Sequence, residues 1–443
     1  MRYRMTMLFR FVSVAILLVP SAHAQVATPA TSSTAPGPQL TREDAERMAL
    51  ANNPRTSVSH LLALAQHQVV RQARSAELPQ LEGNITAQGA NDASRVSSGS
   101  LSASRLFTRA GAGINFSQLI TDFGRTSNLV ASTKLQEHAQ QAHELATRED
   151  IVLIADQAFY NALQAQALLR VAEQTVALRQ TTQSQVNQLT QNKLRSTLDL
   201  TFANVNLSQA QLLQLDAQNN VDAAMAALDE VLGLDHPVKY TLVDAAKTNP
   251  PPPDEQTLID LAVKQRPDLQ SLDLTRQSQE KLSRAQRDQL LPTLSAIGTV
   301  GTTPIRNDQY YVSSWDGAIG GNLRIPLFNG FLYSAQAKES RLRAEATAQQ
   351  TRELKNVIVR DVQTAWLDAN NAFRRLAVTA QLLDQANQSL ALAQTRYKLG
   401  LSSIVELSQA QLQQTQAEIT NTNAQYQYRL TLAELTFQTG VQP

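Results

Sequence analysis

The residues that most often carry chemistry are few in this chain, and their spacing does not suit catalysis. His60 and His67 are seven residues apart, and His138 and His143 are five apart. Two imidazoles on one helix face bind a metal at a spacing of four, so neither pair has metal-site spacing. The sequence has no cysteine, no phosphate loop, no GxGxxG, no GxSxG and no HExxH. We therefore predict no metal, no cofactor and no enzymatic activity.

Four charged residues stand out by their positions. Asp199 and Glu406 each precede a leucine near the start of a helix-like run. The helix dipole favours a carboxylate at that position in any helix, so an ordinary structural role is the alternative to a functional one. Arg109 and Arg324 fall on the polar parity of two alternating segments and are predicted to face a barrel lumen. A solvated pore wall and an anion preference both remain open for the two arginines. The helices and strands that position these four residues decide between a structural and a functional role.

The chain contains the same pattern twice. Pro54 recurs as Pro267 at an offset of 213, and further along Gly233 recurs as Gly440 at an offset of 207. Each copy reads as helix, strand, strand, helix, helix, with a single helix-like stretch at its start. Prolines between the copies mark a linker. The predicted division is a first repeat at 40–233 with strands at about 80–120, a linker or equatorial segment at 234–254, and a second repeat at 255–440 with strands at about 293–327.

Residues 1–24 have the features of a signal peptide. Arginines precede an apolar stretch of about ten residues, which is shorter than the ~20 that span a bilayer, and Ala22 and Ala24 suit a cleavage site. Residues 25–39 are mostly Pro, Ala, Thr and Ser and are predicted to be a disordered lead-in. Removing the three arginines of the leader takes the formal charge from +1 to about −2, so nucleic acid is not an expected partner.

The longest helix-like runs have coiled-coil spacing. Valine, alanine, leucine and tyrosine recur every seven residues from Val362 to Tyr397, and a second row of mainly small residues lies three positions later. Rows of small residues on two faces let a helix pack neighbours on both sides, as a ring of helices requires. A run of about 68 residues reaches ~100 Å. The breaks at 192–195 and 399–402 are predicted to be hairpin tips, and the fold class is mainly α with a small β part.

The short segments between the helices alternate like membrane strands. Apolar residues alternate with polar residues and glycines from 110 to 120, except at Gln118, and apolar residues and glycines alternate with mainly polar ones from 315 to 327. Tyr310, Tyr311 and Trp315 suit an aromatic girdle. Strands cross hydrocarbon only as a closed barrel, and four strands are too few to close one. The sequence therefore predicts at least two copies, and three copies would give twelve strands. Two amphipathic hairpins on a soluble core are the alternative.

Together these features resemble the TolC-like outer-membrane efflux family. The most specific pieces are the tip YKLGLSSIVEL at 397–407, followed by Gln409-Ala410-Gln411, and the turn Asp122-Phe123-Gly124, which Phe328-Asn329-Gly330 echoes. The resemblance implies a homotrimer with a transmembrane β-barrel in the outer membrane and an α-barrel of coiled-coil helices in the periplasm. Its expected role is the exit duct of a tripartite efflux pump or a type I secretion system, with a periplasmic adaptor and an inner-membrane pump or ABC transporter as partners.

The same resemblance implies a gate at the periplasmic tips. Asp199 and Glu406 match the acidic positions of the two tips, and Tyr397 and Gly400 belong to the second tip. Acidic side chains at a narrow mouth would concentrate cations, and opening would untwist the hairpins without any chemical step. The first tip has Lys193 where the second has Gly400.

A periplasmic adaptor protein is the rival interpretation, because adaptors also join a coiled-coil hairpin to β structure. Adaptors usually surround one hairpin with a compact, strand-rich module, whereas this chain has two hairpins and isolated strand pairs. Extraction distinguishes the two, since a channel requires detergent and an adaptor without a lipid anchor does not.

Overall fold

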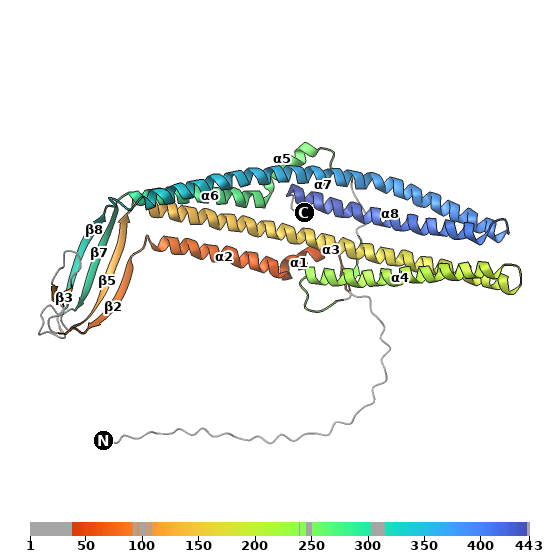
Figure 1. The fold of residues 1–443 in the computed structure, drawn as a ribbon, viewed down its shortest axis with the longest axis horizontal. Coiled ribbons are helices and arrows are strands. Elements are labelled where there is room, and N and C mark those ends of the chain that lie inside the picture. Colours follow the sequence, from red (N-terminus) through yellow and green to blue (C-terminus); the bar gives the residue numbers. More distant parts are fainter. Residues whose placement is uncertain are drawn as a thin grey trace, which may run out of the picture.

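A computed structural model describes residues 38–91, 95–96, 104–105, 109–238, 240–244, 250–302 and 315–440. The predicted signal peptide, most of the predicted lead-in, and Tyr310 and Tyr311 lie outside these residues. The described chain is a long rod with a β-sheet at one end and two helical hairpin tips at the other (Figure 1). No helix in these ranges combines the length and the continuous apolarity that a bilayer crossing needs.

The order of elements confirms the predicted tandem arrangement of helix, strand, strand, helix and helix. The first copy contains α1 (Arg42–Asn52), α2 (Pro54–Ser75), β2 (Gln80–Gln88), β5 (Arg109–Thr121), α3 (Arg125–Gln191) and α4 (Thr197–Val231). The second contains α5 (Glu255–Gln265), α6 (Pro267–Arg287), the 3-10 turn η1 (Asp288–Leu290), β7 (Thr293–Thr302), β8 (Asp316–Arg324), α7 (Leu332–Lys398) and α8 (Ile404–Thr439). Two short pairs that the sequence did not suggest complete the fold: β1 (Gln39–Leu40) with β6 (Thr241–Leu242), and β3 (Arg95–Val96) with β4 (Ser104–Arg105).

The prediction of one helix at the start of each copy is wrong, because a proline divides that stretch in both. Asn53 has an extended backbone with ψ of 125°, as expected for a residue before proline, and Pro54 begins α2. The Asn53 carboxamide oxygen accepts a hydrogen bond from the Arg55 amide at 3.0 Å, and its nitrogen donates to the Val231 carbonyl at 3.0 Å. Arg266 and Pro267 form the corresponding junction between α5 and α6.

The four long strands form one antiparallel sheet in the order β2-β5-β7-β8. The two hairpins of the tandem copies are thus joined through β5 and β7, with an irregularity between Leu119 and Thr121. Paired residues in neighbouring strands point to the same face, so the register decides which rows are apolar. One face carries Leu81, Ile85, Ala112, Ile114, Phe116, Leu294, Val300, Ile319 and Leu323. The other face carries mainly polar residues and glycines, which is the alternation of a barrel wall with one side toward lipid.

The helices form a single layer that continues from the sheet. Close to the sheet α2 packs on α3, α3 on α6, and α6 on α7; toward the tips α4 packs on α3, α3 on α8, and α8 on α7. Helices α3 and α7 have 67 residues each, so each extends for ~100 Å. Small residues fill their seams, as the heptads predicted: Ala365, Ala369, Ala372, Thr379, Ala386 and Ala393 are all buried. Helices α1 and α5 pack on this layer near its middle.

Candidate functional site

The two hairpin tips have the same turn geometry although their sequences differ. Lys193 and Gly400 both adopt left-handed backbone conformations, with φ of 60° and 75°. In each tip the following amide closes the turn: Leu194 N–H donates to the Leu189 carbonyl, and Leu401 N–H to the Arg396 carbonyl, both at 2.8 Å. Glycine adopts this conformation without strain, whereas lysine pays a steric penalty. The turn therefore favours glycine, which the second tip has at position 400 and the first tip lacks.

A serine begins the second helix of each hairpin. The Ser196 hydroxyl accepts from the Leu198 amide at 3.1 Å, and the Ser403 hydroxyl accepts from the Glu406 amide at 3.3 Å. These caps place Asp199 and Glu406 in the first helical turn, as the sequence suggested. The positive end of each helix dipole stabilises a carboxylate there.

The tips of the two hairpins are held together by an apolar cluster. It contains Val186, Ala203, Leu390, Ala393, Tyr397, Ile404, Leu407 and Ala410. Tyr397 is only 6% exposed within it. Because residues from both hairpins share this cluster, separating the tips would expose apolar surface to water.

Arg195 joins the first tip to Tyr397 of the second. Its guanidinium donates to the Tyr397 carbonyl oxygen at 3.1 Å and lies over the phenol ring, 4.5 Å from the centroid. Burial raises the pKa of the Tyr397 phenol; Arg195 opposes this shift and the nearby charge of Asp199 adds to it. The phenolic oxygen itself is buried without a hydrogen-bond partner in the described residues. The structure thus brings Tyr397, Arg195 and Asp199 into one group.

Glu406 belongs to a separate ion pair. Its Oε1 lies 3.2 Å from Arg396 Nε, and both side chains are about half exposed. Neither Arg195 nor Arg396 was identified from the sequence. Their signal was weak, since Arg195 merely precedes a helix cap and Arg396 merely adjoins Tyr397. Arg195 gains its partner from the packing of the two hairpins, and Arg396 gains its partner across the turn of the second hairpin.

A second polar layer joins the hairpins above the tips. Arg179 of α3 is 7% exposed and donates to the Gln411 carboxamide of α8, and Gln411 in turn donates to Thr182 at 3.0 Å. Burial lowers the pKa of Arg179. Asn206 donates to Ser408 at 2.8 Å nearer the tip. A buried guanidinium paired only with an amide favours one register of the two hairpins over others.

At the opposite end of the rod, the strand register shows on which face of the sheet the two arginines expected in the barrel lumen lie. Position 109 pairs with Gln88 and position 324 with Thr293, and both fall on the polar parity of the sheet. Arg324 is exposed. Among the described residues, Arg324 has no neighbour that would make its guanidinium a catalytic group.

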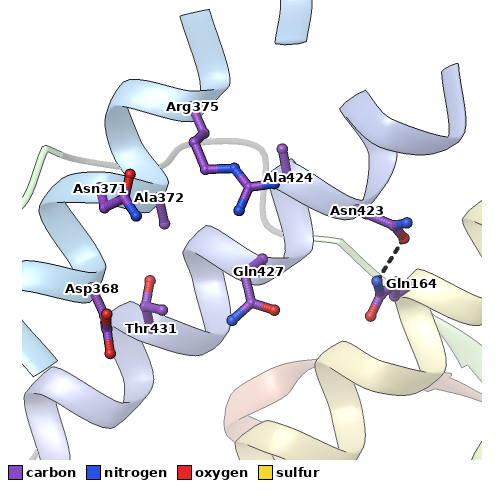
Figure 2. A pocket seen from close by; sticks show the side chains of 9 residues that line it. All are labelled: Gln164, Asp368, Asn371, Ala372, Arg375, Asn423, Ala424, Gln427 and Thr431. Carbon is purple, nitrogen blue, oxygen red and sulfur yellow. Dashed lines mark hydrogen bonds between the residues drawn. The ribbon is translucent and has the colours of Figure 1, made fainter. Parts of the chain in front are cut away.

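One recess between the helices lies away from the tips. Between α7, α8 and α3 lies a cavity of about 520 Å³, where the Gln164 amide donates to Asn423 at 2.8 Å (Figure 2). It is lined by Gln164, Asp368, Asn371, Ala372, Arg375, Asn423, Ala424, Gln427 and Thr431. Amides are the most frequent of these side chains, and the Thr431 hydroxyl donates to the Tyr428 carbonyl oxygen at 2.9 Å.

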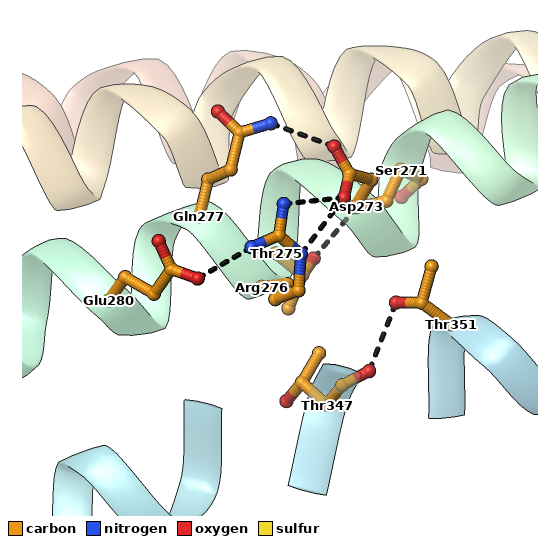
Figure 3. Close-up of polar contacts among 8 residues, drawn as sticks. All are labelled: Ser271, Asp273, Thr275, Arg276, Gln277, Glu280, Thr347 and Thr351. Atoms are coloured by element: carbon orange, nitrogen blue, oxygen red, sulfur yellow. Dashed lines mark hydrogen bonds and ion pairs between the residues drawn. The ribbon is translucent and has the colours of Figure 1, made fainter. Parts of the chain in front are cut away.

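The polar side chains of α6 make contacts that support the fold. Arg276 bridges Asp273 at 2.8 Å and Glu280 at 2.5 Å, and Gln277 donates to Asp273 at 2.8 Å, opposite Thr347 and Thr351 of α7 (Figure 3). Burial raises the pKa of Asp273, but the hydrogen bonds from Arg276 and Gln277 outweigh it and leave this pKa lowered. Both carboxyl groups are therefore already engaged by neighbouring side chains. The described residues contain no cluster of histidine and acidic side chains that fits a metal ion.

Comparison with known proteins agrees with this architecture. The chain is 24% identical over 406 residues to the outer membrane protein TolC of Escherichia coli K12, covering 86% of this chain and 78% of that protein. It is 26% identical over 385 residues to TolC of Vibrio cholerae, covering 84% of each. Its fold matches the Campylobacter jejuni CmeC outer membrane channel with a TM-score of 0.78 at 17% identity, over 96% of this chain and 94% of that one.

Both tandem copies carry the family pattern. Residues 47–234 and 258–441 match the family described as outer membrane efflux protein. The match confirms the resemblance noted in the sequence and gives the adaptor alternative no support. The chain belongs to the outer membrane efflux protein family, and it serves as an exit duct in the outer membrane.

Proposed function

We propose that three copies of this chain close side by side into a β-barrel continuous with a helical tunnel, and that the tunnel conducts solutes passively. The observation that carries this proposal is that one chain has two open edges at every level of the rod. The proposed complex has no cofactor and catalyses no reaction.

The sheet supplies the first pair of open edges. Among the described residues β2 and β8 each pair with a strand on one side only, and nearly all their residues are exposed. In lipid, an unpaired strand edge leaves backbone amides and carbonyls without partners. Pairing β8 of one copy with β2 of the next removes this cost, and twelve strands are ample for a closed barrel.

The helices supply matching edges. α2 and α7 are the outer helices near the sheet, and α4 and α7 are the outer helices near the tips. Each exposes large apolar side chains: Val58, Leu61 and Leu62 on α2; Leu198, Phe202, Val205, Leu212 and Leu215 on α4; and Leu342, Leu367, Val378, Leu382 and Leu392 on α7. Since one edge always carries β2, α2 and α4 and the other β8 and α7, contacts are head to tail and a rotation closes them into a ring.

The tips are the proposed gate. Arg195 ties the first hairpin to Tyr397 of the second, the shared apolar cluster keeps the hairpins aligned, and Gly400 forms the turn between α7 and α8. Opening separates the hairpins at the tip. Exposed leucines 194, 198, 399 and 401 at the same end are the surface on which a periplasmic adaptor and an inner-membrane pump or ABC transporter would dock.

Asp199 and Glu406 supply negative charge at the mouth, and Arg109 and Arg324 supply positive charge in the barrel lumen. Charges at a narrow opening with apolar walls act on passing ions more strongly than charges in open water. Arg396 partly neutralises Glu406 at 3.2 Å. Asp199 should therefore dominate the selectivity of the mouth.

Purified protein in a planar bilayer tests the proposed duct and its charge. We expect ionic currents with a cation preference, and we expect Asp199→Ala to lower the cation-to-anion permeability ratio by about twofold or more. Glu406→Ala should have a smaller effect, and Arg396→Ala should raise the ratio by freeing Glu406.

The control for these charges is Glu339→Ala, because Glu339 is an exposed carboxylate far from the tip with its own arginine at 2.8 Å. It should leave the reversal potential unchanged. Protein that inserts into the bilayer without carrying current would contradict the proposed duct, and equal ratios in all variants would contradict the role of Asp199.

A further inference from the structure

The most unusual buried chemistry in the described chain is not at the tips but where α1 packs on α3. Asp156 of α3 and Glu46 of α1 are two carboxyl groups enclosed together, with side chains 7% and 12% exposed. The only basic group between them is Arg42, whose NH1 lies 3.4 Å from Glu46 Oε1 and 3.4 Å from Asp156 Oδ2. One cation thus faces two potential anions.

The hydrogen bonding of this pair is incomplete if both groups are ionised. Glu46 Oε1 and Asp156 Oδ1 are enclosed oxygens without a hydrogen-bond donor. A buried acceptor without a donor costs about 1 to 3 kcal/mol, and more when it is charged. A single proton held between the carboxyl groups would supply the missing donor and would leave one negative charge for Arg42.

We propose that Glu46 and Asp156 share one proton and that this protonation site fastens α1 to α3. Geometry favours a proton over a metal ion, since only two carboxyl groups converge and a guanidinium already occupies the space beside them. The two groups line a cavity of about 240 Å³ between α1, α3 and α8, which gives water a route to the site.

Among the described residues, the charged and titratable groups that line the cavity or act on the pair come from α1 and α3. Arg42, Glu43 and Glu46 come from α1; Arg148, Glu149 and Tyr160 come from α3. The residues that α8 contributes to the cavity are the uncharged Ala433, Thr436, Phe437 and Gly440. Arg429 and Asp244, which form an ion pair, act on Tyr160 and not directly on the acids.

The sign of the pH dependence follows from the fold. Burial, and then the neighbouring Glu46, raise the pKa of Asp156 to about 8 against the opposing effect of Arg42. Because the pKa is raised in the folded state, the stabilisation is fully present below the ordinary carboxyl range and is lost as pH rises toward about 8. α1 should therefore detach from α3 more readily at high pH. Its detachment would loosen the pairing of β1, which precedes α1, with β6, which follows α4.

Two measurements on the detergent-solubilised full chain test the shared proton. Burial raises the pKa of the neighbouring Glu149 to about 7, so the infrared test is made in a Glu149→Gln background. In that background, spectra should show a protonated-carboxyl band near neutral pH that disappears at about pH 9 and is missing when Asp156→Asn or Glu46→Gln is added. Hydrogen exchange in residues 42–52, corrected for the intrinsic pH dependence, should accelerate about tenfold between roughly pH 6 and 8 in the native chain and much less in either variant.

Glu43→Gln is the matched control, since Glu43 contacts the same arginine at 3.6 Å but is 70% exposed; adding it should leave both readouts unchanged. Absence of the band in the Glu149→Gln background, or its persistence in both variants, would overturn the proposal. So would a titration that moves with sodium or magnesium concentration, which would indicate a bound cation instead. Pore currents are independent of this test, so its failure would leave the proposed duct intact.

Discussion

Arg195→Ala is expected to raise the ratio of open to closed channels by at least about tenfold. The substitution removes a charge-assisted hydrogen bond to the Tyr397 carbonyl and a guanidinium stacked 4.5 Å from the ring centroid. Together these contribute about 2 to 3 kcal/mol per subunit in a half-buried setting. A tenfold change in an equilibrium needs about 1.4 kcal/mol, and each subunit of the ring loses one such contact.

Two conservative variants make the gating prediction specific. Arg195→Lys keeps the charge but loses the planar group, so it should lie between the native chain and the alanine variant. Tyr397→Phe keeps the ring and the backbone carbonyl and removes a hydroxyl that has no hydrogen-bond partner in the described part of the chain, so it should gate normally. Single-channel recording provides the readout. An Arg195→Ala channel with native open probability would refute the clamp.

Ile319→Arg is expected to reduce assembly in the outer membrane by tenfold or more, whereas Gly320→Arg is expected to assemble. Ile319 lies near the centre of β8 on the apolar face and is 85% exposed in the single chain. An arginine facing lipid at mid-bilayer costs about 2 to 4 kcal/mol, and a ring would carry one in every subunit. Gly320 belongs to the opposite face, where a side chain would meet open space.

The amounts of detergent-resistant oligomer in outer-membrane fractions measure this pair of variants. Gly320→Arg should also change the conductance, since its side chain would enter the lumen near Arg324. Equal assembly of both variants, or greater damage from Gly320→Arg, would show that the two faces of the sheet have been assigned the wrong way round.

The repetitive part of the fold could be predicted from the sequence because its determinants are local. The heptad row that ends at Tyr397 and the small residues beside it specify helices that pack on two sides, and the structure buries most of these residues and half-buries Leu376 and Leu383. The alternation from Ala110 to Ile120 likewise specified a strand. The helix-like pattern continues across Pro54 and does not predict the division, whereas the proline forces an extended backbone on the residue before it in both copies.

Contacts between distant segments could not be predicted in this way. Arg195 and Tyr397 are 202 residues apart, and Arg42 and Asp156 are 114 apart, so no periodic pattern links them. The pairing of β5 with β7, which joins the two copies into one sheet, is also non-local. The acidic positions of the tips came from family resemblance. The contact of Arg195 with Tyr397 depends on how the two hairpins pack, and the pair of Arg396 with Glu406 depends on the geometry of the turn between α7 and α8.

The absence of native cysteines makes the central claim, closure between copies, directly testable by cross-linking. Leu212 on α4 and Leu382 on α7 are exposed and lie about fifteen residues from their own tips, hence at about the same height. Within one chain α3 and α8 separate α4 from α7. A chain with cysteine at both positions should therefore cross-link between copies into covalent trimers. Neither single variant should form them. The control pair of Leu212→Cys with Leu64→Cys, which lies nearer the sheet, should not form them either. Monomers that remain uncross-linked, or that cross-link only internally, would contradict the ring.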